Sequence, residues 1–354
     1  MTDVLADIFT DPAFSLTSMI AAINDVDHIP DRAGTLVFAE RDVMKGVPTL
    51  KVVIERVGED LKLVATSARG APAEKVIGDR RSMLELNIPH IQLEDTIQAD
   101  SIQGVREFGT ANQSSTLGSE VRKRLTKIAH RMDYTLEFHR LGALKGVIRD
   151  ADGSILTDLY EAFGFLNSGG IVGPEVFDFD LDNLASESED IRVRAQNVVR
   201  FMRRNAKTIL PKTALPWAFC GDQFFDKLIS RSDLKAAWKG TDAAAALLGG
   251  NYAFGAFEFG GVIWENYQGS DDASTVAVDP AEARFFWSGA PELYGEYYAP
   301  ADYIETVNTP GLPRYAKLAR DTKFNRFVEI EAQMNPLPIC LRPSTLCKGV
   351  ASAP

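Results

Sequence analysis

The strongest pattern of hydrophobic and polar positions lies near the middle of the chain, from Gly118 to Leu141. Apolar residues recur there at steps of three and four, which is the spacing of one face of an α-helix, and the other faces are charged. This apolar stripe consists of Val121, Leu125, Ile128, Met132 and Leu136. Ser119 or Ser115 can cap the start, and Gly142 stands where helices commonly end. The sequence predicts a spine helix roughly 33 Å long.

Strand patterns dominate the region before this helix. Residues 49–57 and 61–66 are rich in β-branched residues, and residues 83–97 alternate again, with Pro89 limiting them to an edge or a bulge. Together they predict one two-stranded ribbon over residues 47–98, with arms extending ~60 Å. A compact chain of this length has a radius of gyration of only ~20 Å. Because an isolated ribbon is barely stable in water, it should lie on a neighbouring subunit.

The two ends of the chain differ in character. Residues 1–33 mix short apolar clusters with Asp and Pro, which predicts an arm lying on another surface, or a frayed end. After the spine helix, Asp150–Gly153 predicts a compact hairpin, and Glu189–Ala206 forms a second amphipathic pattern. Residues 326–333 alternate as a strand and lead through Pro336 and Pro338 to another short strand. These patterns predict an α+β protein.

Composition narrows the class of protein. The chain has 354 residues, of which 45% are hydrophobic and 25% charged, as in ordinary folded proteins. No apolar run approaches the roughly 18 residues that a membrane span needs, and the acidic start is unlike a signal peptide, so we expect a cytoplasmic, non-membrane protein. Three cysteines without metal-ligand spacing, Cys220, Cys340 and Cys347, predict buried free thiols. The net charge of −11 disfavours a protein that grips nucleic acid over its whole surface, but it suits a wall that encloses a polyanion without sticking to it.

Candidate catalytic and metal-binding residues are weak. His130, Asp133 and Glu137 share one face of the spine helix, and a solvated charged face is favoured over a metal site because one helix offers no second ligand set. A carboxylate pair could be drawn from Asp222, Asp226, Glu258 and Glu265, as in any acidic chain. The sequence has no nucleophile elbow and no phosphate-binding loop. It therefore predicts no catalytic, cofactor-binding or metal-binding residue.

Several surface groups allow two interpretations each. The arginines of the second helix either face DNA or form ion pairs, and ion pairing is favoured; they are Arg192, Arg194, Arg200, Arg203 and Arg204. Charged residues near the ribbon tip either contact other subunits or only improve solubility; they are Arg69, Glu74, Lys75, Arg80 and Arg81. Packing is favoured over ligand stacking for the tyrosines at positions 294, 297, 298 and 303.

Four segments of the second half, together with the order of the elements, resemble a known family. They are GDQFFDKL (Gly221–Leu228), FEFGGVIWENYQG (Phe257–Gly269), EARFFWSGAPELYGEYYAPADY (Glu282–Tyr303) and ETVNTPGLPRYAK (Glu305–Lys317). The chain resembles the major capsid protein E family of tailed phages, typified by phage lambda, from about Ser15 to its end. The last three segments are the specific ones, because they are long and unusual in composition.

The resemblance implies the Hong Kong 97 capsid fold and a division of the chain. The expected parts are an N-terminal arm (1–46), an extended β-hairpin loop (47–100), a peripheral domain (101–208) with the spine helix (118–141), an axial domain (209–325), and C-terminal strands that return to the peripheral domain (326–354).

The resemblance also implies a function. Members of the family assemble as hexamers and pentamers into an icosahedral shell that holds double-stranded DNA, with a scaffolding protein, a portal and often a decoration protein. We therefore expect a capsid protein of the virion, assembled in the cytoplasm of the bacterial host. The family carries no catalytic residues that could be transferred to this chain, and no lysine and asparagine motif for covalent cross-linking is recognised.

Three rival functions remain open at this point. A nanocompartment shell would share the fold and enclose protein cargo. A metal-assisted hydrolase using carboxylates of the second half would be a small soluble protein that responds to chelators. A tail or baseplate protein would form rings or tubes. The capsid function ranks first.

Overall fold

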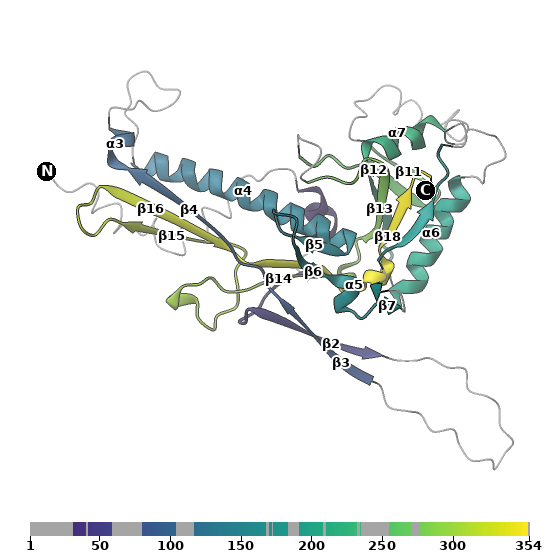
Figure 1. Ribbon diagram of the computed structural model, residues 1–354, viewed down its shortest axis with the longest axis horizontal. Helices are drawn as coiled ribbons and strands as arrows, with labels where there is room; N and C mark the ends of the chain where they lie inside the picture. Colours follow the sequence, from purple (N-terminus) through teal and green to yellow (C-terminus); the bar gives the residue numbers. More distant parts are fainter. Residues whose placement is uncertain are drawn as a thin grey trace, which may run out of the picture.

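The computed structural model has a long helix at one end, a compact body at the other, and a ribbon projecting from between them (Figure 1). The residues that the structure describes are 31–39, 42–58, 80–103, 117–167, 170–171, 173–182, 191–207, 210–231, 234, 255–270 and 276–352. No helix among these is both long enough and apolar enough to cross a lipid bilayer.

The spine helix, α4, runs over Leu117–Lys145 and is longer than the sequence predicts. The predicted stripe is confirmed, because all five of its apolar residues are buried. Gly142 does not end the helix. A side chain there would meet the backbone of Ile148 at 3.1 Å, so this glycine lets the next hairpin pack against α4. The helix ends before Gly146, whose φ of 86° is a left-handed conformation that favours glycine.

One face of α4 packs on a three-stranded sheet of order β15-β16-β4. These antiparallel strands are Tyr315–Arg320, Phe327–Met334 and Ile91–Gln98. Alternate residues such as Ile330 and Ile97 are buried beneath α4, while Glu329 and Thr96 face away from it. The predicted strand at residues 326–333 is confirmed, with its apolar positions on the helix side.

The predicted ribbon over residues 47–98 is wrong at its C-terminal end. The pattern at 83–97 belongs to two strands separated by residues 88–90, which include Pro89. The first, β3 (Arg80–Asn87), pairs antiparallel with β2 (Lys51–Gly58) to form the ribbon. The second is β4, which pairs with β16 because its apolar residues find burial beneath α4. The strand predicted at residues 61–66 lies outside the described residues.

The body is built on a six-stranded sheet of order β11-β12-β10-β13-β18-β9. Its strands are Ala256–Phe259, Val262–Asn266, Leu215–Cys220, Glu282–Ser288, Cys347–Val350 and Glu175–Asp178. Two helices flank it, α6 (Ile191–Ala206) and α7 (Asp222–Ser230) (Figure 1). The second amphipathic helix is thus confirmed as α6, with its apolar side buried. Aromatic rings fill the core, where Phe179 stacks on Phe285 at 5.7 Å between centroids.

Membership in these sheets differs from the predicted division in several places, and β9, from the 101–208 unit, lies in the sheet of the body. Strand β15 belongs with the sheet under α4, although it was expected in the 209–325 unit. Strand β18 pairs with β13 in the body instead of returning to the α4 side with β16. Long alternating segments do not reveal which partner a strand has, because the partner lies far away in the sequence.

A third sheet of order β1-β14-β17 lies between the two ends. Its strands are Met44–Gly46, Tyr294–Tyr298 and Pro336–Cys340, and β17 packs against α4. The predicted hairpin at Asp150–Gly153 is confirmed as β5 (Val147–Arg149) and β6 (Ile155–Asp158). Short elements complete the described fold: a π-helix at Gly34–Phe38, α3 (Ala99–Ile102), α5 (Leu159–Ala162), β7 (Leu166–Asn167), β8 (Gly170–Ile171) and 3-10 turns at Pro291–Leu293, Ile304–Thr306 and Pro343–Thr345.

The three cysteines are free and buried, as the sequence predicts. Burial raises the pKa of the Cys340 thiol to about 12, so this side chain packs as a small apolar group and is not a reactive thiolate.

Candidate assembly surfaces

The ribbon has one buried face and one exposed face. Val52 and Leu86 lie directly opposite each other and pack into the main core. On the other face, Val53 is 60% exposed and Met83 is 78% exposed. Lys51, Glu55 and Glu85 share the face of Val53 and Met83, so this exposed face is charged with two apolar residues in it. Among the described residues, the subunit covers only the face of Val52 and Leu86.

The edges of the ribbon are also open. Among the described residues, β2 and β3 pair only with each other, so the outer edge of each strand presents unpaired backbone groups. Native proteins usually block such edges, because free N–H and C=O groups pair readily with another chain. A free edge beside the exposed side chains of Val53 and Met83 therefore marks the ribbon as a candidate contact between subunits.

A second apolar surface lies beside the base of the ribbon. Ile304 is 92% exposed, Val307 is 62% exposed, and Leu312 is 44% exposed. The N–H of Gly311 in this loop donates to the backbone oxygen of Val47 at 3.1 Å, and Gly46 permits this close approach, since a side chain there would come within 2.2 Å of the carbonyl oxygen of Gly311. Clustered exposed aliphatic residues commonly mark protein–protein contacts. This surface could not be predicted from the sequence, because its apolar residues follow neither helical nor strand spacing.

The predicted tip residues are only partly described. Arg69, Glu74 and Lys75 lie outside the described residues. Arg80 and Arg81 belong to β3, where their backbones pair with Gly58 and Val57 at the end of the ribbon farther from the body. Their role in subunit contacts stays a prediction.

The arginines of α6 have different surroundings. Arg194 donates to the backbone oxygen of Asp178 at 2.6 Å and lies 3.7 Å from the Asp180 carboxylate, so ion pairing is confirmed for this residue. The Arg192 guanidinium lies over the ring of Phe259. Arg200 donates to Asn197 at 3.1 Å. The last turn carries Arg203 and Arg204, both exposed, where positive charge also favours the helix dipole. Contact of these side chains with DNA stays a prediction.

Two of the three charged residues predicted to be solvated on α4 are buried instead. Glu137 is 6% exposed, and its carboxylate accepts hydrogen bonds from the backbone N–H groups of Ala33 and Gly34. Asp133 is 8% exposed and forms an ion pair with Arg314. The prediction was wrong because these partners come from segments more than 100 residues away, which helical spacing cannot reveal.

Two of the other carboxylates considered in the sequence, Asp222 and Glu265, form structural hydrogen bonds. Glu265 is buried and accepts hydrogen bonds from Arg32 at 2.5 Å and from the Trp217 indole at 2.8 Å. Asp222 accepts one from Asn266 at 2.9 Å. No group of three or more His, Cys, Asp or Glu residues in the described part of the chain is placed to hold a metal ion.

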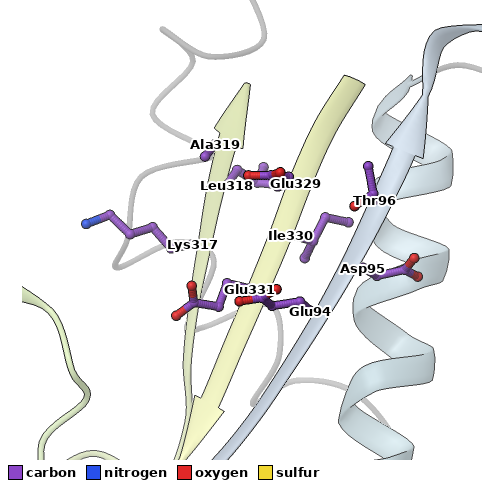
Figure 2. Close-up of a pocket in the computed structure, with 9 residues that line it drawn as sticks. All are labelled: Glu94, Asp95, Thr96, Lys317, Leu318, Ala319, Glu329, Ile330 and Glu331. Atoms are coloured by element: carbon purple, nitrogen blue, oxygen red, sulfur yellow. The ribbon is translucent and has the colours of Figure 1, made fainter. Parts of the chain in front are cut away.

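A shallow hollow lies on the face of the β15-β16-β4 sheet that points away from α4 (Figure 2). Its volume is about 150 Å³, well below the few hundred Å³ typical of a ligand site. The side chains around it include Glu94, Glu331 and Lys317 (Figure 2). Glu94 and Glu331 are cross-strand neighbours of like charge. The hollow is therefore part of an acidic sheet surface. It is too small and too shallow to enclose a substrate.

The tyrosines considered as ligand-stacking groups pack into the fold, as favoured. Tyr294 is buried, its ring meets that of Phe38 edge-on at 5.8 Å, and its hydroxyl oxygen accepts from the backbone N–H of Trp287 at 3.2 Å. Tyr298 and Tyr303 are also buried, whereas Tyr297 is half-buried.

The fold is that of Hong Kong 97-type capsid proteins. The backbone resembles the crystal structure of a protein assigned as a prophage capsid protein in E.coli CFT073, with a TM-score of 0.53 and 11% identity, covering 95% of this chain and 99% of that chain. At 11% identity this likeness shows the fold alone, and the class of protein that it defines is one with the capsid fold.

Residues 15–351 match the family described as phage major capsid protein E, and the chain belongs to this family. It is 27% identical to the major capsid protein of Pseudomonas phage KPP10 over 324 residues, which cover 85% of this chain and 87% of that protein. It is also 27% identical to the major capsid protein of Salmonella phage Felix O1 over 310 residues, covering 79% and 81%. The family resemblance seen in the sequence is thus confirmed.

Proposed function

We propose that this major capsid protein assembles as hexamers and pentamers into the icosahedral shell that encloses the double-stranded DNA of a tailed phage. The observation that carries the proposal is the ribbon, which projects from the body with two open edges and with Val53 and Met83 exposed on its outer face (Figure 1). Within the described residues, the subunit does not bury these groups. Neighbours related by rotation can cover them in turn, and such contacts close into rings.

Several weak contacts are enough for a stable shell. The loop that carries Ile304 and Val307 offers a second apolar surface, separate from the outer ribbon face at Val53 and Met83. When a subunit binds several neighbours at once, each further contact forms within one assembly and adds to the total affinity. Two apolar surfaces on different elements suit a subunit that is surrounded by copies of itself.

The proposed parts of the subunit follow the sheets. The N-terminal arm would reach residue 46, and β2 and β3 would form the extended loop. The peripheral domain would contain α4 with the β15-β16-β4 sheet, and the axial domain would contain the six-stranded sheet. We place α6 with the axial domain, since Gly260 in the β11–β12 turn packs against Ala195 of α6.

The charge of the chain suits an enclosing wall. With a net charge of −11, most of the surface repels DNA, so a packaged genome would not adhere to the shell. Arg192, Arg200, Arg203 and Arg204 would supply the few positive groups that face it. Each phosphate contact adds affinity that falls with salt, and a small number keeps the DNA releasable.

The proposed role is structural, with no catalytic step, cofactor or metal. Its partners would be other copies of the chain, a scaffolding protein, a portal, packaged DNA without sequence preference, and a decoration protein on the outer surface. Assembly would take place in the cytoplasm of the host bacterium, and the product would be the capsid of the virion.

Electron microscopy of the purified protein, with and without a co-expressed scaffolding protein from the same phage, tests the proposal. Closed particles of uniform diameter with five- and six-fold units are the expected result. Tubes or open rings would instead favour a tail or baseplate role. Closed shells from infected cells that retain protein cargo and no nuclease-protected DNA would contradict the DNA-enclosing function.

A further inference from the structure

Residues 31–38, which we call the anchor segment, lie between α4 and the body (Figure 1). Phe38 is fully buried in the main core. The backbone oxygen of Leu36 accepts a hydrogen bond from Ser288 at 3.0 Å. This segment therefore fastens the start of the described chain to both halves of the subunit.

A buried carboxyl group of α4 holds the other end of the anchor segment. Oε1 of Glu137 accepts from the backbone N–H of Ala33 at 2.8 Å and from the Tyr267 hydroxyl at 2.8 Å. Oε2 accepts from the N–H of Gly34 at 3.2 Å. The Asp31 carboxyl group, which accepts a hydrogen bond from Arg140, lies near enough for its negative charge to raise the pKa of the Glu137 carboxyl group. Two neighbouring buried carboxyl groups repel each other when both are ionised, and a proton on one of them removes this repulsion.

Among the described residues, no nearby guanidinium group forms an ion pair with Glu137 itself. Arg140 donates to both oxygens of Glu296, each at 3.0 Å, and also to Asp31. Arg32 pairs with Glu265. The titratable and charged groups around Glu137 are Asp31 and Arg32 of the anchor segment, Asp133 and Arg140 of α4, Glu265 and Tyr267 of the body, Glu296 and Tyr298 of the central sheet, and Arg314, which directly precedes β15.

Carboxyl groups thus outnumber guanidinium groups in this cluster. Burial, and then the neighbouring Asp31, raise the pKa of Glu137 to about 8. Both causes have the same physical origin, because an ionised carboxylate is costly in a site that excludes water and already holds another negative charge. The geometry and the charge balance agree that this pair retains a proton at neutral pH.

We propose that Asp31 and Glu137 share one proton, and that this shared proton fastens the anchor segment to α4 as a pH-sensitive latch. When the segment opens, water reaches Glu137 and its pKa returns toward the ordinary value of 4.5. At any pH between these two values, opening releases a proton. The closed latch is therefore most stable at low pH, weakens as the pH rises, and reaches its weakest level above about pH 8.

Hydrogen exchange measured by mass spectrometry on unassembled subunits tests the latch. The probes are the backbone amides of Ala33 and Gly34, with rates corrected for the intrinsic effect of pH. We expect the opening constant in the wild-type chain to rise about tenfold per pH unit between pH 5.5 and 7.5 and to level off above 8. A flat wild-type profile would overturn the proposal.

The variant Glu137→Gln keeps the shape of the side chain and cannot ionise. Its opening constant should not change over the same pH range, whatever its absolute stability. Asp31→Asn gives a second route if the first variant folds poorly: removing the neighbouring charge should lower the pH at which the profile levels off. The same slope in Glu137→Gln as in the wild type would remove Glu137 from the mechanism.

Asp133→Asn is the matched control. It replaces a buried carboxylate one turn earlier on α4, where the partner is Arg314. This variant should keep the wild-type slope even if it is less stable. Loss of the slope in the control would show a general effect of charge under α4 and overturn the assignment to Asp31 and Glu137. No step of the test requires shells, so its outcome is independent of the proposed function.

Discussion

The six-stranded sheet of the body and the ribbon differ in how their apolar side chains are covered. Both contain strands with apolar residues on each face. In the body, Trp264 and Phe285 are fully buried, because neighbouring strands, helices and loops of the same chain cover them. In the ribbon, Val52 is buried while its neighbour Val53 is 60% exposed. The body covers its own apolar residues, whereas we propose that another subunit covers the exposed face of the ribbon.

The largest effect on stability is expected in the body. Replacing Phe285 by alanine removes a ring that packs against Phe179 and Trp264. Loss of a buried aromatic side chain from a core typically costs about 3–5 kcal/mol. Urea unfolding of unassembled subunits should show this loss in the free energy of unfolding. A change below ~1 kcal/mol would mean that the core tolerates the cavity and that the body is less tightly packed than described.

A somewhat smaller loss is expected where α4 joins the central sheet. Arg140→Met removes the partner of the buried Glu296 and one partner of Asp31. Breaking a buried ion pair from one side costs roughly 3 kcal/mol, because an unpaired buried charge remains. In the double variant Arg140→Met with Glu296→Leu, part of the loss should return. If the double variant is no better than the single one, the pairing does not control stability here.

A much smaller effect is expected from the charged pair on the ribbon. Nζ of Lys51 lies 2.5 Å from Oε1 of Glu85, and both side chains are more than half exposed. Exposed ion pairs contribute between about 0 and 1 kcal/mol because water and salt screen them. Lys51→Ala should therefore shift the urea midpoint only slightly. A loss comparable to that of Phe285→Ala would mean that the outer face of the ribbon is already covered within the subunit.

The smallest effect on stability should accompany the largest effect on assembly. Met83→Asp changes a side chain that is 78% exposed, so the free energy of unfolding should change by no more than ~0.5 kcal/mol. A carboxylate buried between subunits without a partner is costly, and assembly should be lost. Light scattering of scaffold-driven assembly measures this. Ile155→Asp, at a 56% exposed position in the β5–β6 hairpin, is the control and should still assemble.

The spine helix shows which buried residues can be predicted from the sequence and which cannot. Its first half has one buried stripe and charged outer faces, so spacing alone identified Val121, Leu125 and Ile128 correctly. Its second half is buried on more than one side, and the same reasoning wrongly assigned Asp133 and Glu137 to solvent. Local periodicity reports the faces of a helix, but it does not report how many of them other segments cover.

The pairing partner of a strand could not be predicted from the sequence for a related reason. The alternating pattern ending at Ile97 looked continuous with the ribbon, yet β4 pairs with β16, more than 200 residues later. The predicted contact residues were limited in the same way, because an exposed charge such as Arg203 looks the same whether it meets solvent or a partner. The family resemblance, by contrast, was carried by long segments around Phe257 and Glu282 and was confirmed.

Deletion of residues 66–80, examined by electron microscopy beside the full chain under identical assembly conditions, tests the central claim most directly. The deletion should give soluble subunits whose unfolding in urea remains cooperative, and these subunits should form no closed shells. Particles indistinguishable from those of the full chain would contradict the claim that the ribbon completes its fold on a neighbouring subunit.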